Sequence, residues 1–335
     1  MKLDDIGFYT LTDARAKNVA ECYKDMALPY SRCEIIITKQ CNFACPYCRG
    51  IECTEMSLDT MKQTIDTLGG VKNIRFSGGE PTMNPHLLDA VKYASEKGVE
   101  RIAISTNGSR SFMEYQKLIN AGVNDFSISL DACCSSTGDM MAGNKAGAWN
   151  RVVDNIRKLS SITYVTVGVV ITEENLNDVK SIINFADMLG VSDIRVIPSA
   201  QYNKFLDTLK LVSPRIYSSR PILKYRVGQA IAEKHVRGLT DNDVNRCPLV
   251  LDDIAIKGND HYPCIIYMRE NGAPIGKITD GADKIREDRI AWFQTHDTKC
   301  DGICNKNCLD VCVEYNNTCA SYIDGVLVDS YDKIE

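Results

Sequence analysis

The chain has 335 residues, 44% of them hydrophobic, which is enough for one large domain and a smaller one. Its formal net charge of −5 argues against a nonspecific nucleic-acid binder, and no stretch approaches the roughly 18 apolar residues that a membrane span requires. Fifteen cysteines exceed what core packing uses, so their spacing carries information.

The N-terminal sequence, which begins Met1-Lys2-Leu3-Asp4, lacks the apolar core of a signal peptide. We therefore expect a soluble, cytoplasmic protein without membrane contact. In a reducing compartment, closely spaced cysteines bind metal more often than they form disulfides. Residues 1–33 are expected to be an N-terminal extension.

Residues 34–198 alternate between strand and helix patterns. Six separated strands with helices between them predict an α/β fold with a parallel sheet, either doubly wound or curled into a partial barrel. In both versions the chemistry lies at the carboxyl ends of the strands. The expected strands, rich in β-branched residues, are 34–38, 72–77, 101–106, 125–130, 163–171 and 193–197.

Several helix ends are legible between these strands. Ser57 predicts an N-cap, and Asn84-Pro85 predicts a helix with proline at its first position. Ser111 and Glu114 have the spacing of a capping box.

The first expected strand is followed by Cys41, Cys45 and Cys48 in a C-x3-C-x2-C array. Three thiolates on a short loop suit an iron–sulfur cube, because each binds one iron and the fourth iron stays open. A closed zinc site would need a fourth ligand, which Cys53 could supply, so the spacing alone leaves zinc possible.

The second expected strand is followed by Gly78-Gly79-Glu80-Pro81. Paired glycines allow close approach of the backbone to a ligand, and Glu80 offers an acceptor to a cationic group. Taken alone, this segment would be an ordinary loop at a strand end.

Together, the cysteine loop and the Gly-Gly-Glu-Pro segment resemble the radical S-adenosylmethionine (SAM) superfamily, over about residues 33–198. The resemblance implies a partial (β/α)6 TIM-like barrel whose cysteine loop holds a [4Fe–4S] cluster. The open iron would chelate SAM, and its reductive cleavage would give a 5′-deoxyadenosyl radical that removes a hydrogen atom from the substrate. The resemblance implies these cofactor-binding residues: Gly78, Gly79, Glu80, Pro81, Ser105, Asn107, Ser129 and Asp131.

After residue 198 the alternation stops. We interpret residues 199–240 as a basic linker, because 200–238 carry eight Lys and Arg against two acids. This stretch is either a solvated face or a collector of an anionic substrate, a nucleotide or an acidic electron-donor protein. Residues 241–335 form an expected second domain with seven cysteines, which zinc or iron–sulfur clusters would explain: Cys247, Cys264, Cys300, Cys304, Cys308, Cys312 and Cys319.

Given the first domain, this region is similar to the SPASM or twitch-type extensions of radical SAM enzymes, which hold auxiliary [4Fe–4S] clusters. Two spacings depart from the SPASM pattern: C-x3-C-x3-C-x3-C in residues 300–312, and one extra residue between Gly258 and Cys264. A single-cluster twitch arrangement is therefore the alternative to two clusters. The resemblance implies one cluster on Cys247, Cys264 and Cys312, and another on Cys300, Cys304, Cys308 and Cys319.

Cys133 and Cys134 follow the fourth expected strand on the side of the expected site. A thiol there could donate a hydrogen atom to a substrate radical, so both are candidate catalytic residues. The alternative is that they are small buried residues.

We expect a radical SAM enzyme of the oxidoreductase, epimerase or crosslinking type, supplied with electrons by a flavodoxin- or ferredoxin-type donor. Peptide or protein modification by crosslinking, epimerisation or oxidation is the first hypothesis, although few residues precede the first strand for a leader-binding domain. Alternatives are a dehydrogenase or epimerase of an amino sugar or cyclitol, and modification of a nucleotide or nucleic acid. An iron–sulfur electron carrier or a zinc-bound interaction protein would explain the cysteines but not the residues 78–81.

Overall fold

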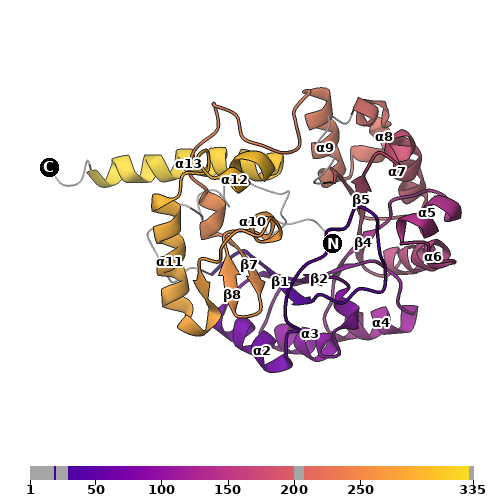
Figure 1. Ribbon diagram of the computed structural model, residues 1–335, viewed down its shortest axis with the longest axis horizontal. Helices are drawn as coiled ribbons and strands as arrows, with labels where there is room; N and C mark the ends of the chain where they lie inside the picture. Colours follow the sequence, from indigo (N-terminus) through magenta and orange to yellow (C-terminus); the bar gives the residue numbers. More distant parts are fainter. Residues whose placement is uncertain (1–18, 20–28, 200–206, 332–335) are drawn as a thin grey trace.

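The computed structural model describes residues 19, 29–199 and 207–331, with side chains up to residue 323. Within these residues, no helix combines the length and the apolar character needed to cross a bilayer. Figure 1 shows helices packed along the outside of one curved sheet, with the C-terminal helix projecting at one side.

The first half of the chain alternates strands and helices as its sequence predicts. The strands are β1 Arg32–Thr38, β2 Asn73–Gly78, β3 Arg101–Thr106, β4 Asp125–Ser129, β5 Tyr164–Ile171 and β6 Asp193–Pro198. The helices are α2 Leu58–Thr67, α3 Leu87–Glu96, α4 Phe112–Ala121, α5 Ser135–Met141, α6 Ala148–Ser160 and α7 Val179–Met188.

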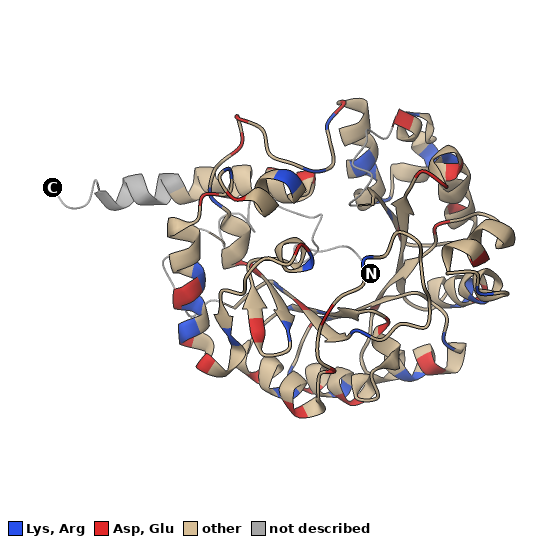
Figure 2. Ribbon diagram, in the orientation of Figure 1, with Lys and Arg blue, Asp and Glu red and all other residues tan. Residues whose placement is uncertain are grey.

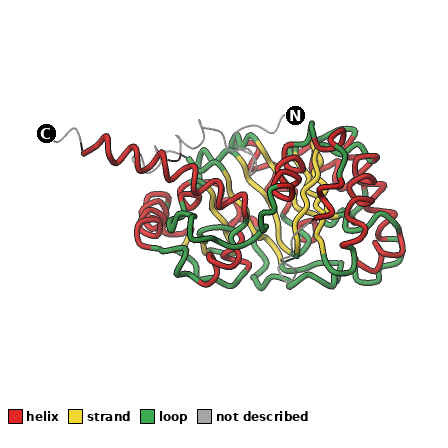
Figure 3. Tube along the Cα trace, turned by 90° about the horizontal axis from the view of Figure 1, so that it is seen from above, coloured by secondary structure: helices red, strands yellow, loops and turns green. Residues whose placement is uncertain are grey.

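The strand order decides between the two predicted sheets. Strands β1 to β6 are parallel and lie side by side in chain order. A doubly wound sheet would reverse this order at a switch point, whereas an unbroken order lets the sheet curl around an interior. The fold is therefore the partial barrel (Figure 1), and the carboxyl ends of its parallel strands lie at one end of it. Figure 3 shows the strands, in yellow, with helices on either side.

Strand β1 shows how the pleat divides the barrel from the helical layer. Cys33, Ile35 and Ile37 are fully buried in the main hydrophobic core, among apolar side chains of the outer helices. The alternate residues Arg32 and Glu34 line the interior of the barrel. This period of two turns apolar groups toward the helices and Arg32 and Glu34 toward the interior, whereas Ile36, the next residue of the inner face, packs in a small apolar cluster with residues of β7 and β8.

Two predicted helix ends are confirmed and one is wrong. The Ser57 side chain accepts a hydrogen bond from the Thr60 backbone at the start of α2, and Ser111 and Glu114 form the capping box of α4. Helix α3 begins at Leu87, so its first residue is not Pro85. The Asn84 side chain accepts a hydrogen bond from the His86 amide and donates to the carbonyls of Ile37 and Met56. These bonds hold the segment as a turn, so the helix cannot begin at Pro85.

The C-terminal half adds to the same sheet, which its sequence did not predict. Strand β7 Asp253–Lys257 pairs in parallel with β1, and β8 Asp260–Tyr262 and β9 Gly276–Lys277 continue in antiparallel order. The division of the chain at residues 198 and 240 stays a prediction. The remaining helices are α8 Pro214–Tyr217, α9 Pro221–Ile231, α10 Ile265–Arg269, α11 Ala282–Thr295, α12 Gly302–Asn307 and α13 Asp310–Tyr331.

Four basic residues of the 200–238 stretch form ion pairs with acids of the fold itself. Figure 2 shows positive and negative residues mixed along the outer helices. This favours a structural face over a collector of nucleic acid or another polyanion. The ion pairs are Lys210–Glu233 at 2.8 Å, Arg215–Asp187 at 3.0 Å, Arg220–Asp187 at 2.9 Å and Arg226–Asp310 at 2.5 Å.

Candidate functional site

A cavity of about 470 Å³ opens at the carboxyl ends of the barrel strands and extends down into the barrel. Most of the predicted cofactor-binding residues meet here, although they come from β1, β2, β3, β4 and the loops after them. The lining includes Cys41, Cys45, Cys48, Gly78, Gly79, Ser105, Asn107, Ser129 and Asp131.

The glycine pair supports the cysteine loop. The Gly79 amide donates to the Thr38 carbonyl at 2.9 Å, and the Glu80 amide donates to the Gln40 carbonyl at 2.7 Å. A Cβ on Gly79 would lie 2.6 Å from the Lys39 carbonyl oxygen, and one on Gly78 would overlap the Thr38 carbonyl. The close approach that requires glycine is therefore to the cysteine loop, in addition to any approach to a ligand.

The three thiols of the loop fit an iron–sulfur cluster with three protein ligands. Burial, aided by Asp131 and the other two thiols, raises the pKa of Cys45 to about 12. Such crowding disfavours thiolate until a cation binds between the sulfurs. Cys53 packs instead in a small apolar cluster with Ile36 and does not line the cavity, so the four-cysteine zinc site gains no support.

Tyr47 connects the cysteine loop to the barrel. Its hydroxyl donates to Asp131 at 2.5 Å, and the other oxygen of Asp131 accepts from the Val170 amide at 2.7 Å. Burial raises the pKa of Asp131 to about 6, with these hydrogen bonds acting in the opposite direction. The aromatic residue before the last cysteine thus fixes the loop against the ends of β4 and β5.

Glu80 lies behind the cavity wall. Its buried carboxylate accepts from the Thr106 hydroxyl at 2.8 Å, the Asn107 amide at 2.7 Å, and the Thr82 amide and hydroxyl at 3.1 and 2.6 Å. Burial raises the pKa of Glu80. This network positions Asn107 at the rim, while the contact of Glu80 and Pro81 with SAM stays a prediction.

Cys133 and Cys134 lie outside the set of residues that line the cavity. Cys133 is half-buried against the main core, and Cys134 is exposed at the start of α5, near the hydroxyls of Ser136 and Thr137. The structure therefore gives no support to a hydrogen-atom donor at either position, and their catalytic role stays a prediction.

Five C-terminal thiols gather around one small apolar cavity of about 30 Å³. This differs from the division implied by the sequence, in which two of the five belonged with Cys300 and Cys319. Cys300 is exposed, and Cys319 is fully buried on α13 within an apolar cluster. The five thiols are those of Cys247, Cys264, Cys304, Cys308 and Cys312.

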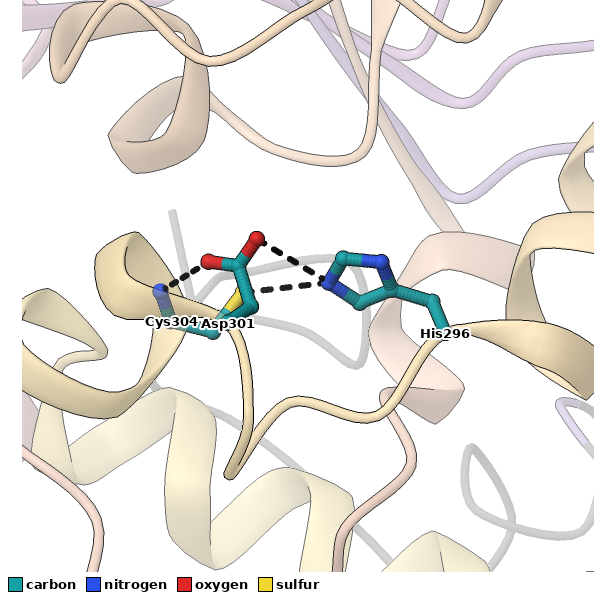
Figure 4. A group of neighbouring side chains, drawn as sticks. All are labelled: His296, Asp301 and Cys304. Atoms are coloured by element: carbon teal, nitrogen blue, oxygen red, sulfur yellow. Dashed lines mark hydrogen bonds and ion pairs between the residues drawn. The ribbon is translucent and has the colours of Figure 1, made fainter.

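His296 lies beside this thiol group (Figure 4). Its Nε2 is 3.5 Å from an Asp301 oxygen and 4.0 Å from the Cys304 sulfur, and its ring stacks on Trp292. The other oxygen of Asp301 accepts the Ile303 and Cys304 amides at the start of α12. Single histidines give no spacing signal, so only the fold brings these groups together.

One ion pair joins the two cysteine regions. Arg49, next to Cys48, donates to both oxygens of Glu270 at 2.7 and 2.8 Å. Glu270 directly follows α10, which begins after Cys264. The cysteine loop is thereby tied to the element that carries an auxiliary thiol.

Residues 35–186 match the Radical SAM superfamily. A probable GTP 3′,8-cyclase of Metallosphaera sedula is 26% identical over 218 residues, which are 62% of this chain and 68% of that protein. An AdoMet-dependent heme synthase of Methanosarcina barkeri is 28% identical over 163 residues, and these are 46% of each chain. This chain thus spans about half to two thirds of the length of these relatives.

Two solved structures share the fold over most of the chain. SuiB of Streptococcus suis bound to SAM has a TM-score of 0.60 at 15% identity, and covers 82% of this chain and 67% of its own. The enzyme anSMEcpe with bound SAM has a TM-score of 0.60 at 13% identity, and covers 92% and 96%. Both likenesses extend beyond the barrel into the C-terminal half.

Proposed function

Because this chain belongs to the radical SAM superfamily and carries a SPASM-like, cysteine-rich C-terminal region, we propose that it abstracts a hydrogen atom from a substrate held in the barrel cavity. The observation that carries the proposal is the meeting of Cys41, Cys45 and Cys48 with Gly78-Gly79 on one cavity wall. A [4Fe–4S] cluster held by Cys41, Cys45 and Cys48 would, when bound together with SAM, supply the one-electron reductive cleavage of SAM that such an abstraction needs.

The chain's own residues hold and shield this chemistry. Tyr47 and Asp131 fix the cysteine loop, and Glu80 fixes Asn107 at the cavity rim. The cavity reaches from this rim to the first residues of the strands, so a substrate can lie below the cofactors and away from bulk water.

We further propose a single auxiliary [4Fe–4S] cluster in the C-terminal region. Five thiols around one cavity can supply the four ligands that a closed cluster takes, with one thiol to spare. Cys300 and Cys319 do not line this cavity, although Cys319 shares an apolar cluster with Cys247 and Cys312, and the five thiols can supply four ligands without them. The electron donor and the cytoplasmic location stay predictions.

As substrate we propose a side chain of a peptide or protein. The fold neighbours that extend over the C-terminal half include SuiB bound to the precursor peptide SuiA and anSMEcpe bound to peptides. A small anionic molecule is the second candidate, because arginine side chains line the lower cavity and the relatives in sequence are named for GTP cyclisation and heme synthesis.

The first experiment measures 5′-deoxyadenosine from SAM with dithionite as reductant, after anaerobic reconstitution. We expect product from the wild type and from Cys53→Ala, and none from a variant with alanine at Cys41, Cys45 and Cys48. Product from that triple variant, or none from the wild type with its iron in place, would falsify the proposal.

The second experiment separates the substrate classes. A deuterated extract of the source organism is supplied to the enzyme, and deuterium in 5′-deoxyadenosine is measured by mass spectrometry. If protease treatment of the extract abolishes the transfer, the substrate is a peptide or protein. If the transfer survives protease treatment, the substrate is a small molecule.

A further inference from the structure

The lower part of the cavity, beneath the cysteine loop, holds a group of arginines. Arg32, Arg75, Arg101 and Arg195 come from β1, β2, β3 and β6, and all four line the cavity. Guanidinium groups cannot lose their charge in proteins, so each one placed here requires a negative partner or water.

Three of these arginines have carboxylate partners within the fold. Arg32 binds two carboxylates, whereas Arg75 and Arg101 share the single carboxylate of Asp125. The contact from Arg75 is the long one, at 3.4 Å, while its other amino group donates to the Ser105 hydroxyl at 3.1 Å. The pairs are Arg32–Glu34 at 2.8 Å, Arg32–Asp253 at 2.7 Å and Arg101–Asp125 at 2.8 Å.

Arg195 differs from the other three. Within the described part of the chain it has no carboxylate at ion-pair distance, and its contact with Ser127 is long, at 3.4 Å. The Nε atoms of Arg195 and Arg75 are buried, and neither has a hydrogen-bond partner among the described residues. Burial lowers the pKa of Arg75 to about 10, and the neighbouring Arg195 cation acts in the same direction.

The backbone of β5 leaves room for this guanidinium. A Cβ on Gly168 would lie 3.3 Å from Nη2 of Arg195, closer than ordinary van der Waals contact. Glycine in the middle of a strand weakens it, and here the position also admits the arginine head group beside the backbone.

The charge balance of this part of the cavity leaves one positive charge. Four guanidiniums meet three carboxylates, those of Glu34, Asp125 and Asp253. Arg195 is half-buried, and the hydroxyls that Arg75 and Arg195 contact, those of Ser105 and Ser127, lie at paired positions of β3 and β4. The two guanidiniums can therefore both offer N–H groups to one carboxylate, which would offset the cost of an unpaired cation. One carboxylate would neutralise this excess positive charge, whereas a dianionic phosphate would leave a net negative charge.

We propose that Arg195, assisted by Arg75, binds a carboxylate of the substrate. This contact sets how deep the substrate lies in the cavity, and so where its reacting carbon lies relative to the cysteine loop. This deepens the proposed function and rests on it, since it takes the barrel cavity as the substrate site. It assigns the substrate to carboxylate-bearing molecules, whether free acids or an acidic group of a peptide.

The test uses acetate as the probe, by saturation-transfer NMR on the reconstituted enzyme. We expect transfer to acetate in the wild type and in Arg195→Lys, and at least about tenfold weaker binding in Arg195→Met and Arg195→Gln. Arg215→Met is the matched control, because that arginine lies on the outer face with a side chain 77% exposed. Inorganic phosphate is added as competitor.

Equal acetate binding in the wild type, Arg195→Met and Arg195→Gln would overturn the proposal, and so would phosphate displacing acetate at lower concentration than acetate itself binds. Each protein is also assayed for 5′-deoxyadenosine without substrate. We expect that activity to survive in Arg215→Met, and the iron content of the Arg195 variants to equal that of the wild type, which shows that their cluster site is intact. A wild type that binds acetate but cleaves no SAM would refute the proposed function alone.

Discussion

The buried ion pair between Arg226 and Asp310 gives a prediction whose size follows from the structure. Their side chains are 2% and 8% exposed, and the two hydrogen bonds measure 2.5 and 3.0 Å. Asp310 lies between Cys308 and Cys312, so the pair fixes the auxiliary thiols against α9. Arg226→Met leaves a buried carboxylate uncompensated, and we expect it to lower the free energy of unfolding by about 3–5 kcal/mol.

The double variant Arg226→Met/Asp310→Leu should recover most of that loss, because apolar groups of similar size replace a buried pair at little cost. The assay is urea unfolding of the metal-free protein, followed by circular dichroism, with iron counted after reconstitution. We expect the single variant to lose auxiliary iron and to keep the iron of the cysteine loop.

Arg215→Met, which removes an exposed pair, is the control and should cost less than about 1 kcal/mol. If the Arg226 variant costs no more than this control, or if the double variant is no more stable than the single one, the reasoning about buried charge is wrong for this site.

Three further predictions follow. Gly79→Ala should displace the cysteine loop, because its Cβ would overlap the Gln40 carbonyl, and 5′-deoxyadenosine formation should fall with the iron content. A variant with alanine at both Cys304 and Cys308 should lose about four irons per chain, because only three of the five grouped thiols remain, whereas Cys300→Ala should lose none; equal losses would contradict a single auxiliary cluster. Burial, and after it the neighbouring Arg289 cation, lowers the pKa of His261 to about 3. The His261 side chain therefore stays neutral in the native state, whereas in the unfolded chain it is protonated below about pH 6.5. Stability should therefore fall as the pH falls, by roughly 2 kcal/mol at about pH 5, and His261→Gln should remove that fall in acid titrations of unfolding; an unchanged pH profile would refute it.

The barrel was predictable because its signals are local. Each of the six strands is a short β-branched run, and caps such as Ser57 and the Ser111–Glu114 box mark helices within a few residues. The helix start at Pro85 was predicted wrongly because the Asn84 side chain reaches across the fold to β1. The residues next to Asn84 in the sequence do not indicate such a long-range contact. The pairing of β7 with β1 is likewise a contact over more than two hundred residues.

The candidate site also has a part that could be predicted from local sequence and a part that depends on long-range packing. The cysteine loop and the glycine pair are contiguous motifs, so their residues could be named from the sequence. Which of the seven C-terminal thiols meet depends on how α10, α12 and α13 pack, and spacing does not encode this. Arg75 and Arg195 left a weak signal that was missed: each is a charged residue in the middle of a strand with apolar neighbours, which indicates a polar barrel interior.

The central place of β1 in the sheet affects how this protein is made. Strand β1 has β2 on one side and β7 on the other. During synthesis, the edge of β1 that pairs with β7 has no hydrogen-bond partner until residues 253–257 have left the ribosome. A chain cut after residue 198 leaves that edge open, and an open edge of a buried, apolar strand invites aggregation. Attempts to produce the barrel without the C-terminal half should yield insoluble material, and iron insertion into the cysteine loop should follow synthesis of the whole chain.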